Sequence, residues 1–504
     1  MAKKFGILMG SLTLLCAVFL AGVAVAFPRP NPVFLELDEE ASTDPADYLL
    51  GLPFAVKRAE VDVSGVNPDR VGTYSATVRI FLFEYTVQVE VRDTTGPVIQ
   101  PLGLYPYIAV GRDYVPEDFV ESITDCSDVV QRAIFYNGGD HDTIRFDTPG
   151  EHQAVIRAVD EWGNESRRDV TFTVDEAPVI IGAFDRHIAV GSDFDVEAVA
   201  AADSVDGVLS DRVEVDVGAF DPKMAGDYPI TYLVRDNYGL ESVKTVTVSV
   251  VPRSELRRYE DDLSLTREEM TLLCDVDYFG YEPLAEPDCE AAAALIEPTL
   301  INLKRSFGNG GWVSGSGAVY RVTPDFVIFL SVTHVVEDIH SDCHVLFFDG
   351  NGITEDFAYV TSDQPNELAL FVIPTGDIPT DTLLALKELY VDPDIYSELQ
   401  EGDEVLSFAK HWDGTSRDLV KTMKVRSLTT SIREFDLINS LVETTWNLHS
   451  GMSGTPTVDG RGRLVGAASA TGPSTTGYSD NSAFHSKIDV LPELEEKLEL
   501  SVKS

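Results

Sequence analysis

The chain has 504 residues, of which 44% are hydrophobic, and its formal net charge at pH 7 is −46. This length predicts several domains with packed cores. A surface this acidic repels phosphate backbones and anionic headgroups, so nucleic acid is not an expected partner. The acidic side chains are most simply a solubilising coat, and they would attract cations or basic polypeptides.

The N-terminal segment is typical of export. Lys3 and Lys4 precede an uncharged apolar stretch over residues 5–26, which ends in small residues before Phe27. This pattern predicts a cleaved signal peptide over residues 1–26. The stretch also reaches the length that spans a bilayer, so a retained anchor is the alternative. Membrane contact is expected only through this segment, since no later stretch is long and apolar enough.

Three segments with a shared pattern follow, over residues 27–96, 97–176 and 177–252, with a period of about 80 residues. Each alternates apolar and polar residues over short strands separated by Gly, Asp and Asn turns, which predicts small antiparallel β-sandwiches. Residues 203–207, with Asp203 and Asp206, would offer oxygens to Ca²⁺, but an Asp-Gly turn is the commoner explanation. No metal site is therefore predicted.

The shared pattern resembles the Ig-like repeats of bacterial surface proteins. That resemblance implies stalk or adhesive modules, so a cell-surface ligand is one expected partner. A spacer without a specific ligand is the simpler role, since a fold alone does not define a function.

A charged, helix-compatible stretch over residues 253–290 predicts a linker with one or two short helices. From residue 291 to 504 the pattern is again that of short strands and turns, which fits two antiparallel barrels. Residues 488–498 predict an amphipathic helix that closes the chain.

Four cysteines lie beyond the N-terminal segment. Export permits disulfides, and Cys274 and Cys289 flank a short loop, so they are the expected pair. Cys126 and Cys343 fall in different predicted domains and are expected to be buried thiols. Cys343 and His344 begin a predicted strand, which would aim them at opposite faces and argues against a metal site there.

Three stretches of the C-terminal region carry candidate chemistry. An apolar run over residues 326–332 is followed by Thr333 and His334, Glu367 opens the apolar run 368–373, and Ser453 lies in a glycine-rich turn. A serine hydroxyl is a poor nucleophile unless a base lies within hydrogen-bond reach, and the base needs a third group that fixes its tautomer. Successive N–H groups in a glycine-rich turn can bind an oxyanion.

These stretches, in this order and preceded by a Gly-Ser-Gly segment at residues 315–317, resemble the chymotrypsin-like (trypsin-like) serine proteases. The spacing is closest to the bacterial trypsin-like and high-temperature-requirement proteases, and the resemblance covers about residues 291–495. It implies a double β-barrel with a C-terminal helix, protein or peptide substrates and no cofactor. The resemblance also assigns site residues: nucleophile Ser453, base His334, orienting acid Glu367, oxyanion-hole amides of Gly451 and Ser453, and a substrate-pairing strand edge at Ser469 and Ala470.

The chain departs from the family pattern in several places. Glu367 stands where the family strongly prefers Asp, and Asp363 is the alternative acid. Met452 replaces an acidic residue, which argues against activation by a new N-terminal amine that pairs with that acid. Asn447 occupies the expected floor of the specificity pocket and carries no charge, so neutral side chains are expected before the cleaved bond. Thr455 and Val332 replace the usual Gly and Ala.

The sequence therefore predicts an all-β multidomain chain: tandem Ig-like β-sandwiches over residues 27–252, a linker, and a chymotrypsin-like double β-barrel with a C-terminal helix over residues 291–504. The predicted function is an exported or surface-anchored serine endopeptidase displayed on Ig-like modules. The alternative is a catalytically weak or inactive protein that keeps the protease fold for binding or adhesion.

Overall fold

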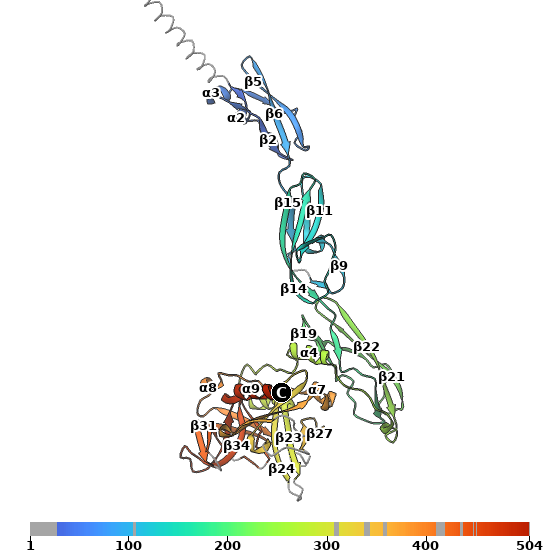
Figure 1. Cartoon of the computed structure of the whole chain (residues 1–504), viewed down its shortest axis with the longest axis vertical. Helices are drawn as coiled ribbons and strands as arrows, with labels where there is room; N and C mark the ends of the chain where they lie inside the picture. The colour runs from blue at the N-terminus through green and yellow to red at the C-terminus, as the bar shows by residue number, and fades with distance from the viewer. Residues whose placement is uncertain are drawn as a thin grey trace, which may run out of the picture. The chain divides into compact units, whose positions relative to one another are not determined.

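The computed structural model describes residues 28–103, 107–306, 312–336, 343–355, 360–409, 419–433, 437–446, 448–449 and 451–502. The predicted signal or anchor segment lies outside these residues. Over the described ranges, none of the helices combines the length and the apolar character needed to cross a bilayer. The chain forms two compact units, residues 1–175 and 176–504 (Figure 1).

The first module is a four-stranded sheet in the order β2-β6-β5-β4, with a small β1-β3 pair. Its core is built by alternate residues of the long hairpin, such as Ala76, Val78 and Val89, which are fully buried. The elements are β1 (Arg29–Pro30), β2 (Val33–Glu36), α2 (Pro45–Tyr48), β3 (Leu49–Leu50), α3 (Pro53–Val56), β4 (Glu60–Asp62), β5 (Gly72–Ile80) and β6 (Phe83–Arg92).

The second module has a five-stranded sheet in the order β12-β11-β14-β15-β8, with β10-β7 and β13-β9 pairs. Phe119 and Phe172 pack in its core with ring centroids 4.8 Å apart. The strands are β7 (Val98–Pro101), β8 (Tyr107–Ala109), β9 (Asp113–Tyr114), β10 (Val120–Thr124), β11 (Val129–Tyr136), β12 (Gly139–His141), β13 (Ile144–Arg145), β14 (Gly150–Asp160) and β15 (Glu165–Asp175).

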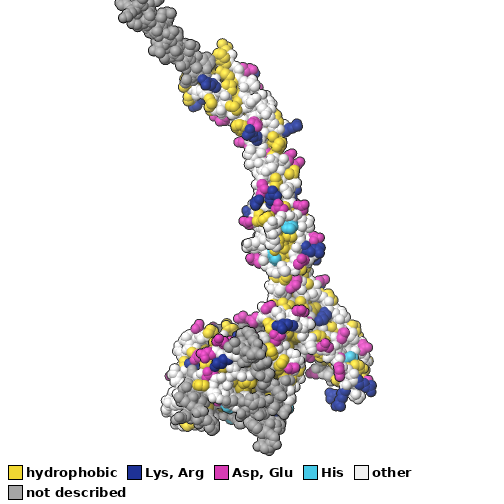
Figure 2. Space-filling model, viewed as in Figure 1, with side chains coloured by type: hydrophobic (Ala, Val, Ile, Leu, Met, Phe, Trp, Pro, Cys, Tyr) yellow, Lys and Arg dark blue, Asp and Glu magenta, His cyan; other side chains and the backbone are white. Residues whose placement is uncertain are grey.

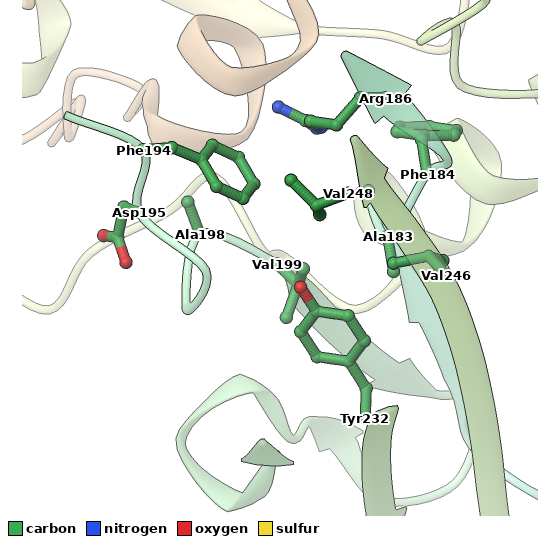
Figure 3. Close-up of a pocket in the computed structure, with 11 residues that line it drawn as sticks. Ala183, Phe184, Arg186, Phe194, Asp195, Ala198, Val199, Tyr232, Val246 and Val248 are labelled. Atoms are coloured by element: carbon green, nitrogen blue, oxygen red, sulfur yellow. The ribbon is translucent and has the colours of Figure 1, made fainter. Parts of the chain in front are cut away.

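The third module has a four-stranded sheet, β17-β22-β21-β20, and a three-stranded sheet, β16-β18-β19. Its strands are β16 (Val179–Ile181), β17 (Arg186–Ala189), β18 (Ala200–Asp203), β19 (Gly207–Val208), β20 (Glu214–Asp216), β21 (Gly226–Arg235) and β22 (Glu241–Val251). A small pocket in this module is bordered by Arg186, Phe194 and Tyr232 (Figure 3). The Arg186 guanidinium lies over the Phe194 ring, 4.9 Å from its centroid, and also pairs with Asp381 at 2.9 Å.

The predicted linker contains α4 (Arg267–Asp275) and, at its end, α5 (Cys289–Ile296). Thr266 and Asp288 cap these helices with their side-chain oxygens, as expected for N-cap residues. Met270 and Leu273 are buried in the same apolar core as the first sheet of the C-terminal domain. This stretch is therefore packed against the domain that follows it.

The C-terminal domain begins with a seven-stranded antiparallel sheet in the order β27-β26-β23-β24-β25-β29-β28. Its strands are β23 (Leu300–Ser306), β24 (Trp312–Val322), β25 (Phe326–Ser331), β26 (Cys343–Phe347), β27 (Gly352–Glu355), β28 (Val360–Asp363) and β29 (Leu368–Pro374). Short helices follow β25 and β29: α6 (Thr333–Val336), α7 (Thr380–Ala385) and α8 (Ile395–Glu398).

The second half of this domain is a closed six-stranded barrel, β30-β31-β32-β35-β34-β33, followed by the helix α9 (Leu491–Val502). Its strands are β30 (Glu404–Ala409), β31 (Leu419–Arg433), β32 (Leu437–Thr445), β33 (Pro456–Asp459), β34 (Leu464–Pro473) and β35 (Asn481–Lys487). Barrel closure pairs the strands of this half on both sides, although β34 continues beyond Ala467, the last residue that pairs with β33. The predicted all-β multidomain class is confirmed: tandem β-sheet modules precede a C-terminal domain with a seven-stranded sheet, a closed six-stranded barrel and a C-terminal helix.

The expected pairing of Cys274 with Cys289 is wrong, because all four described cysteines are free thiols. Cys274 lies in the last turn of α4 with its Sγ 3.6 Å from the Val322 carbonyl oxygen, and burial raises its thiol pKa to about 12. Cys289 begins α5, and burial also raises its pKa. Cys343 is buried as expected, but Cys126 is exposed, contrary to the prediction.

The acidic composition is visible on the surface. Figure 2 shows Asp and Glu side chains spread over the visible face of the described residues, interspersed with Lys and Arg, without one dominant patch. This distribution suits the predicted role of the acidic side chains in solubility.

Candidate active site

The sheet register brings His334 next to Glu367. β25 and β29 pair antiparallel with Ser331 opposite Ala369, so the end of β25 meets the start of β29. His334 lies on α6, just after β25, and Thr333 fixes the junction: its hydroxyl donates to the Leu368 carbonyl at 3.2 Å. Two stretches separated by more than thirty residues thus come together at the ends of two adjacent strands.

The Glu367 carboxylate faces the His334 imidazole. The distance from Nδ1 to a carboxylate oxygen is 3.4 Å, and the His334 backbone N–H donates to Oε2 at 3.3 Å. The Glu367 side chain is 15% exposed and the His334 side chain 47%. A shielded carboxylate beside a half-exposed imidazole is the arrangement that orients a general base.

The backbone of Glu367 is in the left-handed region, with φ 57 and ψ 31. Non-glycine residues adopt this conformation rarely, and such strain concentrates at functional sites. Asp363 supports the turn, because its Oδ1 accepts hydrogen bonds from the Asn366 N–H at 3.0 Å and the Asn366 amide at 2.8 Å. Asp363 is thus engaged in capping, and the residue that the structure places against His334 is Glu367.

Ser453 lies in a turn that is fixed against β24. Its carbonyl accepts a hydrogen bond from the Ser316 N–H at 2.7 Å, and the Ser316 hydroxyl donates to the Gly451 carbonyl at 2.9 Å. Gly454 has φ +88, and a Cβ there would lie 2.0 Å from the Ser316 carbonyl oxygen. Only glycine fits this position, which explains the Gly-rich motif physically.

The two amides predicted to form the oxyanion hole, those of Gly451 and Ser453, lie in this turn. Gly451 has φ +91. The N–H groups of Met452 and Thr455 donate within the turn, to His449 and Met452 carbonyls. Within the described part of the chain, no acceptor is recorded for the N–H groups of Gly451 and Ser453. Unpaired amides in one turn can bind a developing oxyanion.

The helix that carries His334 and the turn that carries Ser453 both lie against Gly315. A Cβ at Gly315 would lie 2.5 Å from a Val335 methyl carbon and 3.2 Å from the Ser453 carbonyl oxygen. Among the described contacts, no hydrogen bond joins the His334 ring to the Ser453 hydroxyl. Catalytic hydrogen bonds are often long without substrate and tighten in the complex.

The predicted substrate-pairing residues lie at an open edge of β34. Ser469 is the extra residue of a β-bulge opposite Phe484, and its hydroxyl donates to the Phe484 carbonyl at 3.1 Å. The pairing of β33 with β34 extends along β34 as far as Ala467, and the next residue, Ala468, makes backbone hydrogen bonds with the Ser453 turn. From Ser469 onward, no other described strand pairs with this edge. Asn447, the predicted pocket floor, lies outside the described residues, and its role stays a prediction.

Sequence reasoning missed two buried polar groups in the barrel. His485 is fully buried and holds the Thr444 and Thr457 hydroxyls at 2.9 and 2.8 Å, and burial lowers its pKa to about 3. Glu443, also fully buried, accepts hydrogen bonds from the hydroxyls of Ser474 and Ser482, each at 2.6 Å. The hydrogen-bond partners of these two residues lie on strands and loops distant from them in the sequence. The alternation of apolar and polar residues therefore does not predict these contacts.

Comparison with known proteins identifies one module by sequence. Residues 179–250 match the family described as bacterial surface protein, Ig-like domain. An uncharacterized 81.3 kDa protein of Acholeplasma phage L2 is 25% identical over 204 residues, which are 38% of this chain and 28% of that protein. The chain therefore matches less than a third of the length of this relative.

Three of the solved structures that resemble the chain are proteases. The HtrA-type protease AlgW with tripeptide gives a TM-score of 0.34 and 19% identity over 42% of this chain and 63% of its own. A serine endoprotease from Yersinia pestis gives 0.32 and 17% over 43% and 68%. The Rv3671c protease from M. tuberculosis, active form, gives 0.31 and 16% over 43% and 89%. By sequence, residues 179–250 of the chain thus match a bacterial surface Ig-like domain, and the C-terminal domain consists of a seven-stranded sheet followed by a closed six-stranded barrel.

Proposed function

We propose that the chain is an exported or surface-anchored serine endopeptidase that cleaves protein or peptide substrates, with Ser453, His334 and Glu367 as its catalytic triad. The observation that supports this most is the distance of 3.4 Å between the Glu367 carboxylate and Nδ1 of His334. The helix that carries His334 and the turn that carries Ser453 also both lie against Gly315. No cofactor is required by this chemistry.

The proposed reaction is acyl transfer. His334 takes the hydroxyl proton of Ser453 through Nε2, and the Ser453 oxygen attacks the peptide carbonyl carbon. The N–H groups of Gly451 and Ser453 stabilise the oxyanion, and each such donor is worth about 10²–10³ in rate. His334 then protonates the leaving amine, and a water molecule, deprotonated by His334, hydrolyses the acyl-enzyme. Glu367 holds Nδ1–H and stabilises the imidazolium.

The substrate would bind as an added strand. The open edge of β34 at Ser469 and Ala470 follows Ala468, whose carbonyl accepts from the Gly454 N–H and whose N–H donates to the Thr455 carbonyl, each at 2.8 Å. An extended peptide that pairs with this edge would run past the Ser453 hydroxyl. Asn447 favours neutral side chains before the cleaved bond.

The Ig-like modules and the N-terminal segment support export. Residues 1–26 would direct the chain out of the cytoplasm, and membrane contact would arise only if they are retained. The modules would then display the protease-fold domain, and a cell-surface ligand is the partner expected for an adhesive role.

The test is hydrolysis of an unfolded, fluorescently labelled protein by the full-length chain. Wild type and Ser397→Ala, which changes an exposed serine on α8, should cleave equally, and Ser453→Ala should not cleave. Equal rates for wild type and Ser453→Ala would refute the proposal. If no variant cleaves although all are folded, the alternative of an inactive binding protein is favoured, and the absent hydrogen bond between His334 and Ser453 would be its structural basis.

A further inference from the structure

The β5–β6 hairpin of the first module turns through two apolar residues. Ile80 pairs with Phe83 at the end of the ladder, so Phe81 and Leu82 form the turn itself. A two-residue hairpin turn with positive φ at its first central position favours Gly there. Phe81 holds that position at φ 54 and is 70% exposed, and Leu82 is 99% exposed. Turn propensity and core packing therefore do not explain these two side chains.

The corresponding hairpins of the other two modules turn differently. Between β14 and β15 the chain passes through Gly163 at φ 89, and between β21 and β22 it passes through Gly239 at φ 83. Asp160 and Asp236 support these turns, because the Oδ1 atom of each accepts two backbone N–H groups. The apolar turn is therefore a feature of the module that comes first in the chain.

The apolar turn lies at the end of the module where the chain enters it. β2 runs parallel to β6 with Val33 opposite Val89, so the residues before Val33 lie towards the start of β6, next to the turn. Figure 1 shows the turn of this hairpin and α3 at the same end of the module. In the second module the equivalent turn lies against the segment that leads into that module, since the Asn164 side-chain amide donates to the Asp93 carbonyl at 3.1 Å. The segment that leads into the first module is the uncharged apolar stretch over residues 5–26.

A second exposed apolar stretch, residues 50–54, lies at the same end. Its large exposed side chains are those of Leu50, Leu52 and Phe54. A Cβ on Gly51 would lie 3.1 Å from the Pro28 Cα, and Pro28 is the first residue that the structure describes. The stretch therefore borders the point where the N-terminal segment leads into the module. We call residues 50–54 and 81–83 together the apolar end, and Figure 2 shows hydrophobic side chains gathered there.

The charges around the apolar end suit a membrane surface. Acidic residues outnumber basic ones by 84 to 38 in the whole chain, yet residues 48–58 contain no acid and end in the exposed cations Lys57 and Arg58. Glu84, the acid that follows the turn, is paired with Arg79 at 3.0 Å. Exposed aromatic and aliphatic side chains bordered by long basic ones are typical of protein surfaces that lie between lipid headgroups and acyl chains.

We propose that the apolar end enters the surface of a lipid bilayer beside the retained N-terminal segment. The side chains of Phe54, Phe81 and Leu82 would lie among the acyl chains, where burial of their apolar surface is favourable, and the neighbouring cations would lie at the headgroups. With this second contact beside the anchor, the first module would be held at the membrane in one orientation. The inference rests on the surface-anchored form of the proposed function, but not on catalysis by Ser453.

Photo-crosslinking from within the bilayer tests the contact. The full-length chain is reconstituted in phosphatidylcholine vesicles that contain a small fraction of a phospholipid with a diazirine in its acyl chain, and lipid adducts are mapped by mass spectrometry after illumination. Adducts should form at residues 50–54 and 81–83 at least about tenfold more often than at Met224, an exposed apolar side chain of the third module. Flotation of the chain with the vesicles reports separately on the N-terminal segment.

Two matched variants sharpen the result. Leu82→Asp places a charge in the proposed contact and should lower the adducts at residues 81–83 about fivefold or more. Met224→Asp makes the same kind of change in the third module and should leave them unchanged. Both side chains are exposed, so neither change removes a core contact.

The possible results separate the proposals. A wild-type chain that floats without adducts at the apolar end would overturn this inference, and so would a chain that does not float or adducts that Leu82→Asp leaves unchanged. If the apolar end binds a second copy instead, the adducts will be absent and Leu82→Asp will abolish self-association measured by sedimentation, which also overturns it. Hydrolysis by the same vesicles, with Ser453→Ala as the reference, reports on the catalytic proposal independently.

Discussion

The Glu367 carboxylate contacts His334 at two atoms: it lies 3.4 Å from the ring Nδ1, and it accepts a hydrogen bond of 3.3 Å from the backbone N–H. Glu367 reaches this position from a left-handed backbone conformation, and the Ser486 hydroxyl donates to its carbonyl at 3.3 Å. The longer glutamate side chain is thus accommodated by the turn that carries it. A strained, supported acid beside a half-exposed histidine is hard to explain by packing alone.

Replacement of Glu367 by Gln should lower kcat/KM by roughly 10²–10⁴-fold with the fold intact, because a neutral amide neither stabilises the imidazolium nor selects the correct tautomer. The measurement is kcat/KM for a cleaved peptide. Asp363→Asn is the matched control: it keeps an oxygen that can cap the turn and should cost little. A larger loss in Asp363→Asn than in Glu367→Gln would assign the acid to Asp363 instead.

Gly454→Ala should destabilise the C-terminal domain by about 2–5 kcal/mol, from steric overlap and left-handed strain together. The Cβ would lie 2.0 Å from the Ser316 carbonyl oxygen. Gly477 has a similar φ of +87, but a Cβ there would meet no atom within 4 Å, so Gly477→Ala isolates the strain and should cost only about 1–2 kcal/mol. Denaturant unfolding compares the two, and equal costs would show that the Ser453 turn is not tightly fixed.

His485 should make the barrel less stable in acid. Its pKa is lowered by burial to about 3 in the folded chain and is about 6.5 when unfolded, so the unfolded state binds the proton first. The stabilisation is complete above pH 6.5 and declines by about 1.4 kcal/mol per pH unit as the pH falls towards 3. Hydrogen exchange of β35, corrected for intrinsic rates, should show this slope in wild type and a shallower one in His485→Gln. Identical slopes would contradict the role of His485.

Glu443→Gln should raise KM several-fold, about 3–10-fold, with little change in kcat, because the loop that follows β34 would lose its central acceptor. Hydrogen bonds from Ser474, Ser482 and Thr475 hold the pKa of Glu443 below its usual value despite the opposing effect of burial. The exposed substitution Glu401→Gln is the control and should leave both constants unchanged. A fall in kcat with unchanged KM would show that Glu443 does not act through the substrate-binding edge.

Short sequence patterns predicted the features that depend on residues close together in the chain. The alternation of apolar residues predicted the strands, and the Gly-rich turn at Ser453 predicted a tight backbone approach, which Gly454 makes against Ser316. The sequence did not predict which side chains come into contact. Cys274 and Cys289 are near in sequence, but their thiols have different neighbours.

The most direct test of the triad is covalent labelling of the full chain by a fluorophosphonate, with the modified residue mapped by mass spectrometry. Ser453 should be the labelled residue in wild type, Ser453→Ala should be unlabelled, and His334→Ala should react at least about 10³-fold more slowly, since the hydroxyl then lacks its base. A folded wild-type chain that does not react at Ser453, or that reacts equally fast without His334, would contradict the account.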